Sequence, residues 1–336
     1  MLMNTAATPA TPATPATLAQ LHHLLDAGQA WSATYRGRMS NHLPMVQQAL
    51  LELGASAERL QAFTEAEETH LEPRDPARPS PVDVARDLGR PYSDVAWRTH
   101  FAGRIAKLGS PAALREALAL LLPGTGAIAF HGLIRTGHAV LAGHDGELAA
   151  GLAHWASHFM PLPTADEAPL ALADWLQALT SLPRPADPAG RFITDRMQAW
   201  GDAAGFATIA GRLQHGPDTL RDLALLAART YAATGNFTVL HLLTASHAMS
   251  VLQPWWPAPE LPRGFSVAAA AGLLASGAVP SFGLDDLPCR PWPVLITAAC
   301  EQDDAHVIKL THAAWRLDRR WPDPAWRRAV ERAIPF

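Results

Sequence analysis

The sequence predicts an all-α protein, a multi-helix array, orthogonal or bundle-like, with long proline-rich loops. The expected helical segments begin near residues that cap or start helices and stop at glycine or proline. No credible run of alternating apolar and polar residues predicts a strand. A Rossmann glycine fingerprint is also missing, because the Gly-Thr-Gly at 124–126 lacks a preceding strand and a third glycine.

The predicted helices are separated by loops rich in proline. The polar and proline-bearing segment 55–90 is predicted to be a surface loop. The predicted helical segments, in chain order, are 18–25, 44–53, 92–108, 110–122, 126–140, 170–179, 192–201, 206–213, 217–234, 237–249, 268–277, 293–300, 304–319 and 324–334.

Composition narrows the class of protein. The chain has 336 residues, 49% hydrophobic and 17% charged, which is typical of a globular protein. Its formal net charge is −4 and its basic residues are dispersed, so we expect no nucleic-acid partner. Apolar runs such as 267–274 are far shorter than the roughly 20 residues that span a bilayer, so we expect no membrane partner. The sequence carries no signal for the oligomeric state.

The cysteines and the N-terminal segment bear on location and domain organisation. Cys289 and Cys300 form neither a CxxC motif nor a zinc spacing, which favours a reduced, cytoplasmic protein. Residues 1–17 contain a Thr-Pro-Ala repeat without the features of a signal peptide, and are predicted to be a disordered tail. Residues 18–336 are predicted to be one helical domain, with 161–190 as a candidate internal boundary.

The segment 303–312 contains an unusual lysine. His306, Lys309 and His312 follow one another at three-residue steps, close to one face of a helix. Lys309 and Lys107 are the only lysines, because arginine supplies almost all the positive charge. An amine, unlike a guanidinium, can lose its proton and take up carbon dioxide. A lysine between two histidines therefore suggests a chemical role.

The segment 126–140 combines histidines with glycines. His131 and His138 are seven residues apart and share a helix face, with Arg135 between them. Gly132 and Gly137 each cost about 1 kcal/mol of helix propensity relative to alanine. A helix that carries this cost is expected to pack very closely against a neighbour. The histidines are candidates either for core packing or for a functional site.

Four histidine segments together with Lys309 suggest a metal site. Imidazole suits iron, zinc, copper or nickel, and the absence of cysteine from these segments argues against a structural zinc. A lysine ammonium cannot bind a metal, but its carbamate supplies a carboxylate oxygen. The histidines, each apolar on at least one flank, are His42, His131, His241 and His306.

Four short motifs resemble signatures of the questin oxidase-like family. They are Ser-Asn-His-Leu-Pro-Met at 40–45, Phe-His-Gly-Leu-Ile-Arg at 130–135, Leu-His-Leu-Leu-Thr-Ala-Ser-His at 240–247 and Asp-Asp-Ala-His-Val-Ile-Lys-Leu at 303–310. They occur in the family's order, and the similar region extends over about residues 18–332. Each motif is weak alone and the set is specific.

The resemblance implies an activity and cofactors. Characterised family members cleave anthraquinone rings oxidatively in fungal polyketide pathways, and the family is described as NADPH-requiring and Baeyer–Villiger-like. A related fungal dioxygenase holds non-haem iron with four histidines and a carboxylated lysine. The resemblance therefore implies an O2-dependent oxygenase with Fe(II), acting on an aromatic or quinone, anthraquinone-like substrate. No nucleotide-binding motif is present, so NADPH is expected only as an electron source. The arginine- and alanine-rich composition with short loops suggests a bacterial chain.

The resemblance also implies roles for residues. The expected iron ligands are His42, His131, His241, His306 and carboxylated Lys309. His138, His247 and His312 are reserve candidates. Arg135, one turn after His131, is expected to hold a phenolate or carboxylate of the substrate. The candidate pocket walls are Trp97, Trp255 and Trp256.

Two other functions stay open from the sequence. A metal-dependent hydrolase on a helical scaffold would need carboxylates near its metals, and only Asp303 and Asp304 lie close to a candidate ligand. A non-catalytic helical protein that binds a small molecule would use the histidines as polar core groups.

Overall fold

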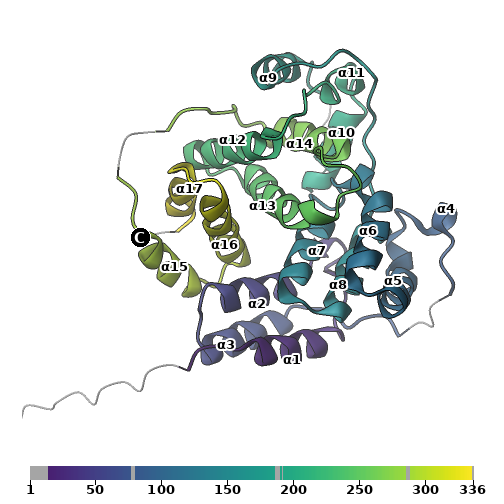
Figure 1. Ribbon diagram of the computed structural model, residues 1–336, viewed down its shortest axis with the longest axis vertical. Coiled ribbons are helices and arrows are strands. Elements are labelled where there is room, and N and C mark those ends of the chain that lie inside the picture. The colour runs from purple at the N-terminus through teal and green to yellow at the C-terminus, as the bar shows by residue number, and fades with distance from the viewer. Residues whose placement is uncertain (1–13, 77–79, 186–189, 191, 285–287, 335–336) are drawn as a thin grey trace, which may run out of the picture.

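The computed structural model describes residues 14–76, 80–185, 190, 192–284 and 288–334, and it confirms the all-α fold (Figure 1). The strands within these ranges are the two-residue pair β1 (Thr34–Tyr35) and β2 (Met39–Ser40), which form an antiparallel hairpin. The predicted disorder of residues 1–13 lies outside the described residues. Residues 14–17 are described and hydrogen bond to residues 55–57 through their backbone.

Seventeen α-helices lie in the described residues, and most match a predicted segment within a few residues. They are α1 (Leu18–Gly28), α2 (Leu43–Glu52), α3 (Ala57–Glu68), α4 (Val84–Asp87), α5 (Asp94–Leu108), α6 (Ser110–Leu121), α7 (His131–Ala142), α8 (Asp145–Ser157), α9 (Leu172–Thr180), α10 (Ile193–Gly201), α11 (Phe206–Ala210), α12 (Thr219–Thr234), α13 (Phe237–Leu252), α14 (Arg263–Ser276), α15 (Trp292–Cys300), α16 (Ala305–Arg320) and α17 (Ala325–Ala333). Short 3-10 turns lie at η1 (Pro91–Ser93), η2 (Leu122–Gly124) and η3 (Gln253–Trp255).

The prediction of a loop over 55–90 is wrong for much of that segment, which contains α3 and the short α4. The Ser56 hydroxyl accepts a hydrogen bond from the backbone N–H of Arg59 and so caps α3. Leu60 and Phe63 then bury one face of α3 against α2. The acidic residues of this segment lie on the exposed face of α3, and this polar composition resembles that of a loop.

The helix α7 begins later than the sequence predicts. The prediction began a helix at residue 126, whereas α7 begins at His131. Ile128, Ala129 and Phe130 have positive φ angles of 44°, 49° and 70°, which no α-helix allows. Strained non-glycine backbone of this kind is frequent at functional sites.

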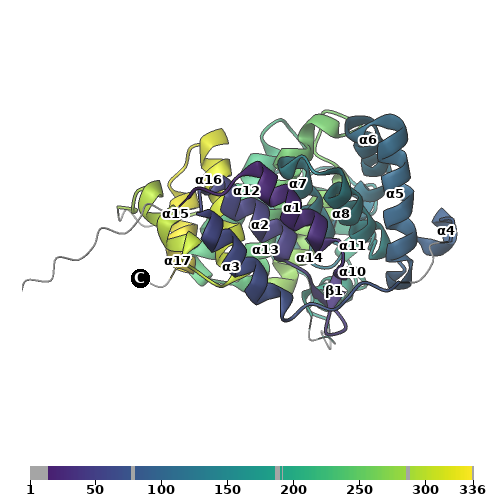
Figure 2. The ribbon, with the colours of Figure 1, turned by 90° about the horizontal axis from the view of Figure 1, so that it is seen from below.

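Four helices surround a common interior at the centre of the molecule. In cyclic order α2 packs on α7, α7 on α13, α13 on α16, and α16 on α2. We call these four helices the central ring. In Figure 1, α13 lies in the middle, with α7 and α16 on either side and α2 below. The helices α8, α12 and α17 pack against α7, α13 and α16, and α1, α2 and α3 form the layer nearest the viewer in Figure 2.

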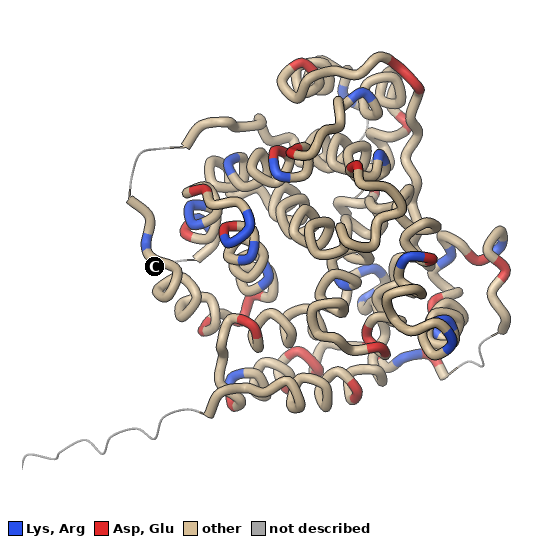
Figure 3. The backbone as a smooth tube through the Cα atoms, viewed as in Figure 1, with Lys and Arg blue, Asp and Glu red and all other residues tan. Residues whose placement is uncertain are grey.

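Charged residues of both signs are interspersed along the outer helices in the view of Figure 3. Among the described residues no helix combines the length and the apolar character that crossing a membrane requires.

Glycines of α7 permit close helix packing, as the sequence suggested. A Cβ on Gly132 would stand 2.6 Å from both Cα and Cβ of Trp155 in α8, and one on Gly137 would stand 2.9 Å from Cβ of Ala248 in α13. Both distances are shorter than packed carbon atoms tolerate. The missing side chains therefore set how closely α7 approaches its two neighbours.

We expect Gly132→Ala to lower the free energy of unfolding by about 1–3 kcal/mol, because the new methyl group overpacks the contact with Trp155. Gly103→Ala in the exposed part of α5 is the matched control, since an added Cβ there meets nothing within 4 Å. The control should raise stability by up to about 1 kcal/mol through helix propensity. Urea denaturation measures both. Equal stability of Gly132→Ala and the unmodified protein would contradict the packing argument.

Candidate metal centre

Each helix of the central ring places one predicted histidine near its N-terminal end. His42 is the N-cap residue of α2, with Pro44 in the first turn. His131 is the first residue of α7, His306 the second of α16, and His241 the fifth of α13. The packing of the ring brings these positions together from four distant parts of the sequence.

The four imidazole rings form a contiguous cluster. The rings of His42 and His131 stack with centroids 4.9 Å apart, and their Nε2 atoms are 2.9 Å apart, as in a hydrogen bond. The ring of His306 meets that of His42 edge-on at 4.7 Å. The ring of His241 lies 4.9 Å from that of His131 and 5.4 Å from that of His306.

Hydrogen bonds on the outer side of the cluster orient three of these rings. The Nδ1 of His131 donates to the carbonyl of Ile128 at 2.6 Å, and the Nδ1 of His241 donates to the carbonyl of Phe237 at 2.8 Å. The Nδ1 of His306 lies 3.0 Å from the carboxylate of Asp304. Because carbonyl and carboxylate oxygens only accept, each Nδ1 carries the proton and each Nε2 of a neutral ring keeps a lone pair.

The strained backbone before α7 orients the His131 ring. The positive-φ residues 128–130 turn the Ile128 carbonyl back onto the His131 ring. Similarly, Asp304 is the N-cap of α16, accepting from the His306 backbone N–H as well as contacting its ring. Local backbone geometry therefore sets the direction of these imidazoles.

Lys309 lies one turn after His306 on α16, buried beside the histidine cluster. Its side chain is 2% exposed, and burial lowers its pKa to about 7, although the carboxylates of Asp304 and Glu67 oppose this shift. Much of the amine is therefore uncharged at neutral pH. The only other lysine, Lys107, lies exposed in the last turn of α5.

Burial keeps the four imidazoles neutral. It lowers the pKa of each ring from its ordinary value, and the positive charge of Lys309 lowers these pKa values further. Uncharged imidazole is the form that binds metals. As the side chains stand, however, no group of three or more His, Cys, Asp or Glu within the described ranges is arranged to hold a metal ion.

The expected role of Arg135 is not supported by its surroundings. Its Nε and Nη2 atoms donate to the Glu147 carboxylate of α8 at 2.5 and 2.9 Å, and the two side chains are only 3% and 4% exposed. Turning Arg135 toward a substrate would leave the charge of Glu147 buried and unpaired. The residue instead ties α7 to α8.

Of the three tryptophans expected to be pocket walls, one lies in the core. Trp97 is fully buried, stacks on Phe101 and donates to the Asp87 carbonyl, so it belongs to the core. Trp255 and Trp256 are partly buried and pack against the main hydrophobic core.

The reserve candidates form a cluster of their own. His138, His247 and His312 are all buried, and their rings neighbour one another deeper in the central ring. Each lies six or seven residues after a histidine of the first cluster on the same helix. We call the first cluster the upper layer and this one the lower layer.

Sequence reasoning missed Phe237 as a functional candidate. Its ring meets the rings of His241 and His306 at 4.7 and 4.6 Å, and its side chain is 52% exposed. It also lines a cavity of about 600 Å³ together with Arg196, Trp200 and Leu274. An aromatic residue at a helix start looks ordinary in a sequence, and only the convergence of α13 and α16 reveals its position.

Comparison with known proteins is consistent with this geometry. The family model described as questin oxidase-like matches residues 39–314, a range that contains α2, α7, α13 and residues 305–314 of α16. No curated protein matches the chain. Because the match extends over most of the sequence and includes every motif of the histidine cluster, the chain belongs to the questin oxidase-like family.

Proposed function

We propose that this protein is an O2-dependent non-haem iron oxygenase acting on an aromatic or quinone substrate of the anthraquinone type. The proposed ligands of the iron are His42, His131, His241, His306 and carboxylated Lys309. The observation that carries the proposal is the convergence of four neutral imidazoles on a buried amine with a lowered pKa. Membership of the questin oxidase-like family supports the oxidase class.

The imidazole arrangement fits a metal ion in two respects. Because a metal–imidazole bond is about 2.1 Å long, two nitrogens that held one ion would stand no more than about 4.2 Å apart. The Nε2 atoms of His42 and His131 are already 2.9 Å apart. The outer hydrogen bonds of His131, His241 and His306 also leave Nε2 as the free nitrogen, as in known metal sites. Binding would exchange the His42–His131 hydrogen bond for bonds to the ion.

Lys309 has the properties that carbamate formation requires. The neutral Nζ would attack the carbon of CO2, form an N–C bond and release a proton, leaving an anionic carbamate. The lowered pKa makes the neutral amine available. The N-terminal ends of the four helices would stabilise the resulting negative charge.

Iron(II) in this place would supply the capacity to activate dioxygen. The protein's own contribution is to hold the imidazoles neutral and oriented, and to leave one side of the cluster accessible. His42 and His306 are partly exposed, whereas His131 and His241 are buried. Phe237 contacts the rings of His241 and His306 and also lines the neighbouring cavity.

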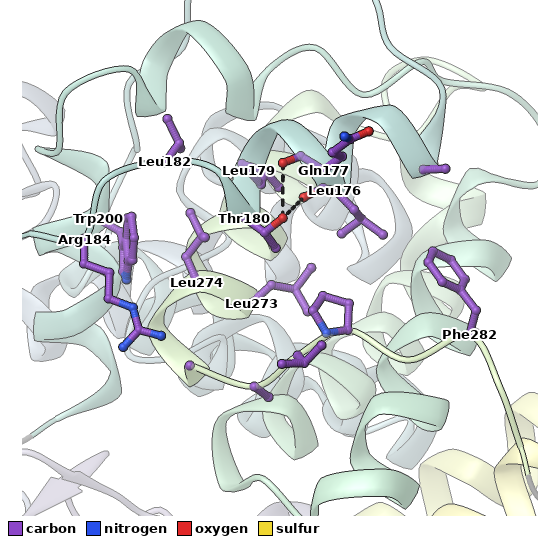
Figure 4. A pocket seen from close by; sticks show the side chains of 15 residues that line it. Leu176, Gln177, Leu179, Thr180, Leu182, Arg184, Trp200, Leu273, Leu274 and Phe282 are labelled. Carbon is purple, nitrogen blue, oxygen red and sulfur yellow. Dashed lines mark hydrogen bonds between the residues drawn. The ribbon is translucent and has the colours of Figure 1, made fainter.

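The cavities beside Phe237 suit a flat aromatic substrate. The cavity lined by Phe237 adjoins a second one of about 450 Å³, since Arg184, Trp200, Leu274 and Gly277 line both. Figure 4 shows the second cavity between Leu176 and Thr180 on one side and Leu273 and Leu274 on the other, with Arg184 and Trp200 at one end. Volumes of this size hold drug-sized ligands. In this proposal Arg184, rather than Arg135, attracts a phenolate or carboxylate of the substrate. NADPH enters the proposal only as an electron source from solution.

The hydrolase alternative has less support. Its two candidate carboxylates have other partners, because Asp303 pairs with Arg59 and Asp304 caps α16 and contacts His306. Neither is placed as a bridge between two metals.

Replacing His241 should remove iron and activity together. After anaerobic Fe(II) reconstitution, we expect His241→Ala to contain one iron fewer per chain than the unmodified protein. Its O2 uptake with a hydroxyanthraquinone should fall by more than about 100-fold, beyond the effect of losing an outer hydrogen-bond partner. Elemental analysis and an oxygen electrode give the two readouts. The control is His154→Gln, which changes a buried histidine outside both layers. Unchanged iron content in His241→Ala would contradict the proposed ligand set.

Lys309→Met should abolish activity without lowering stability, since it removes a buried amine and keeps an unbranched side chain. Lys309→Arg should also be inactive, because a guanidinium cannot form a carbamate. In Lys309→Ala, added acetate should restore part of the O2 uptake by replacing the carbamate oxygen. Full activity of Lys309→Arg, or of the unmodified protein freed of CO2 and bicarbonate, would rule out the carbamate.

Phe237→Ala should raise the KM for the anthraquinone several-fold while leaving iron content unchanged, because it alters substrate contact and not metal binding. Leu273 lines only the second cavity, so the KM of Leu273→Ala shows whether the substrate also contacts that cavity. An unchanged KM in Phe237→Ala would place the substrate elsewhere.

A further inference from the structure

The lower layer repeats the arrangement of the upper one on the same helices. His138 follows His131 by seven residues on α7, His247 follows His241 by six on α13, and His312 follows His306 by six on α16. At 1.5 Å per residue, the two layers are separated by about 9–10.5 Å along the helices. The fourth helix, α2, contributes Gln48 and Glu52. All three lower histidines are at most 4% exposed.

The centroids of the three lower rings are spaced as three imidazoles around one ion would be. Their centroids are 5.2 Å apart for His138 and His312, 5.2 Å for His247 and His312, and 6.2 Å for His138 and His247. The point equidistant from all three lies about 3.2 Å from each centroid, and an imidazole bound through a nitrogen about 2.1 Å from an ion also has its centroid about 3.2 Å away.

Hydrogen bonds fix the protonation of two of these rings. The Nε2 of Gln48 donates to Glu52 Oε2 at 2.9 Å, so its Oε1 is the atom that faces His138 Nδ1 at 2.6 Å. His138 Nδ1 is therefore the donor, and its Nε2 keeps a lone pair when the ring is neutral. His312 Nε2 donates to Glu52 Oε2 at 2.9 Å, which leaves the lone pair on Nδ1.

Buried nitrogens of the lower layer have no partner. His312 Nδ1 and His247 Nε2 are both buried without a hydrogen bond. A buried polar atom without a hydrogen-bond partner costs about 1–3 kcal/mol. Protonating the rings is not a remedy, because burial lowers the pKa of all three. Arg316 lies nearby, but its guanidinium is paired with Glu52.

We propose that the lower layer is a second transition-metal site, in which His138, His247 and His312 bind one divalent ion such as zinc. Glu52 and Gln48 hold the His312 and His138 rings from outside, as carboxylate and amide partners do in known histidine metal sites. The three rings must rotate before all three can bind one ion, since the described side chains do not form a metal site as they are. An ion bound here would give a partner to the buried ring nitrogens that have none.

The second ion has a structural role. The separation of the layers is far larger than the 3.5–4 Å of a bridged two-metal centre, so the two ions share no ligand. An ion in the lower layer joins α7, α13 and α16 below the upper layer. It thereby fixes the relative positions of the helices that carry the upper histidines.

The test counts metal ions in the full-length protein and its variants. The chain is stripped with a chelator, dialysed against excess Zn²⁺, freed of loose metal and measured by elemental analysis. We expect two ions per chain in the unmodified protein and in the control His154→Gln. His247→Ala and His241→Ala should each bind one, and the double variant none. Thermal unfolding with and without Zn²⁺ should show a smaller metal-dependent rise in Tm for His247→Ala.

The outcomes separate this inference from the proposed oxygenase. If His247→Ala binds as many ions as the unmodified protein, the second site is overturned, whatever His241→Ala does. If instead His247→Ala loses one ion and His241→Ala loses none, the second site stands and the iron ligand set of the upper layer fails.

A second variant covers the case in which His247→Ala does not fold. Glu52→Gln keeps the size of the side chain that orients His312 and leaves every proposed ligand in place. It should weaken Zn²⁺ binding at one of the two sites by about 10–100-fold. Two sites of unaltered affinity in Glu52→Gln would overturn the proposal.

Discussion

The burial of imidazoles and one amine at the centre of a helical protein is the constraint on which the rest of the structure depends. Seven histidines and Lys309 project from helices of the central ring, and most of them are almost completely buried. Polar groups in such a place destabilise a protein unless they are bonded. The Ile128 and Phe237 carbonyls, Asp304, Gln48 and Glu52 bond one side of five of these rings. In each layer, the ring nitrogens on the inner side are the ones proposed to bind a metal ion.

The direction of the four helices follows from the same constraint. Both layers contain α2, α7, α13 and α16, and on each helix the upper layer lies nearer the N-terminus. The helices of the central ring therefore run in one general direction away from the upper layer. Their N-terminal ends favour neutral imidazoles and an anionic ligand beside them. The partner helices α8, α12 and α17 supply the apolar packing that holds this arrangement.

Much of the fold could be predicted because helix signals are local. Proline and glycine boundaries located most helices, and the two glycines of α7 predicted close packing that the contacts with Trp155 and Ala248 confirm. The prediction was wrong where a local signal was ambiguous. The acidic exposed face of α3 resembles a loop in composition. The residues before α7 have positive φ angles although none of them is glycine, so the sequence did not indicate where α7 begins.

The candidate site was predictable only in part. His42, His131, His241 and His306 do cluster beside Lys309, as the family motifs suggested. The spacing that placed Arg135 one turn after His131 could not show that Glu147 of another helix would occupy its guanidinium. For the same reason the pairing of Glu52 with His312, 260 residues apart, had no signature in the sequence.

Crystals of the anaerobic Fe(II)-loaded protein, with diffraction measured on both sides of the iron absorption edge, test the central claim most directly. The account predicts an anomalous iron peak between His42, His131, His241 and His306, with additional density for a carboxylate on Lys309 Nζ. An upper layer without an iron peak, beside an unmodified Lys309, would contradict it.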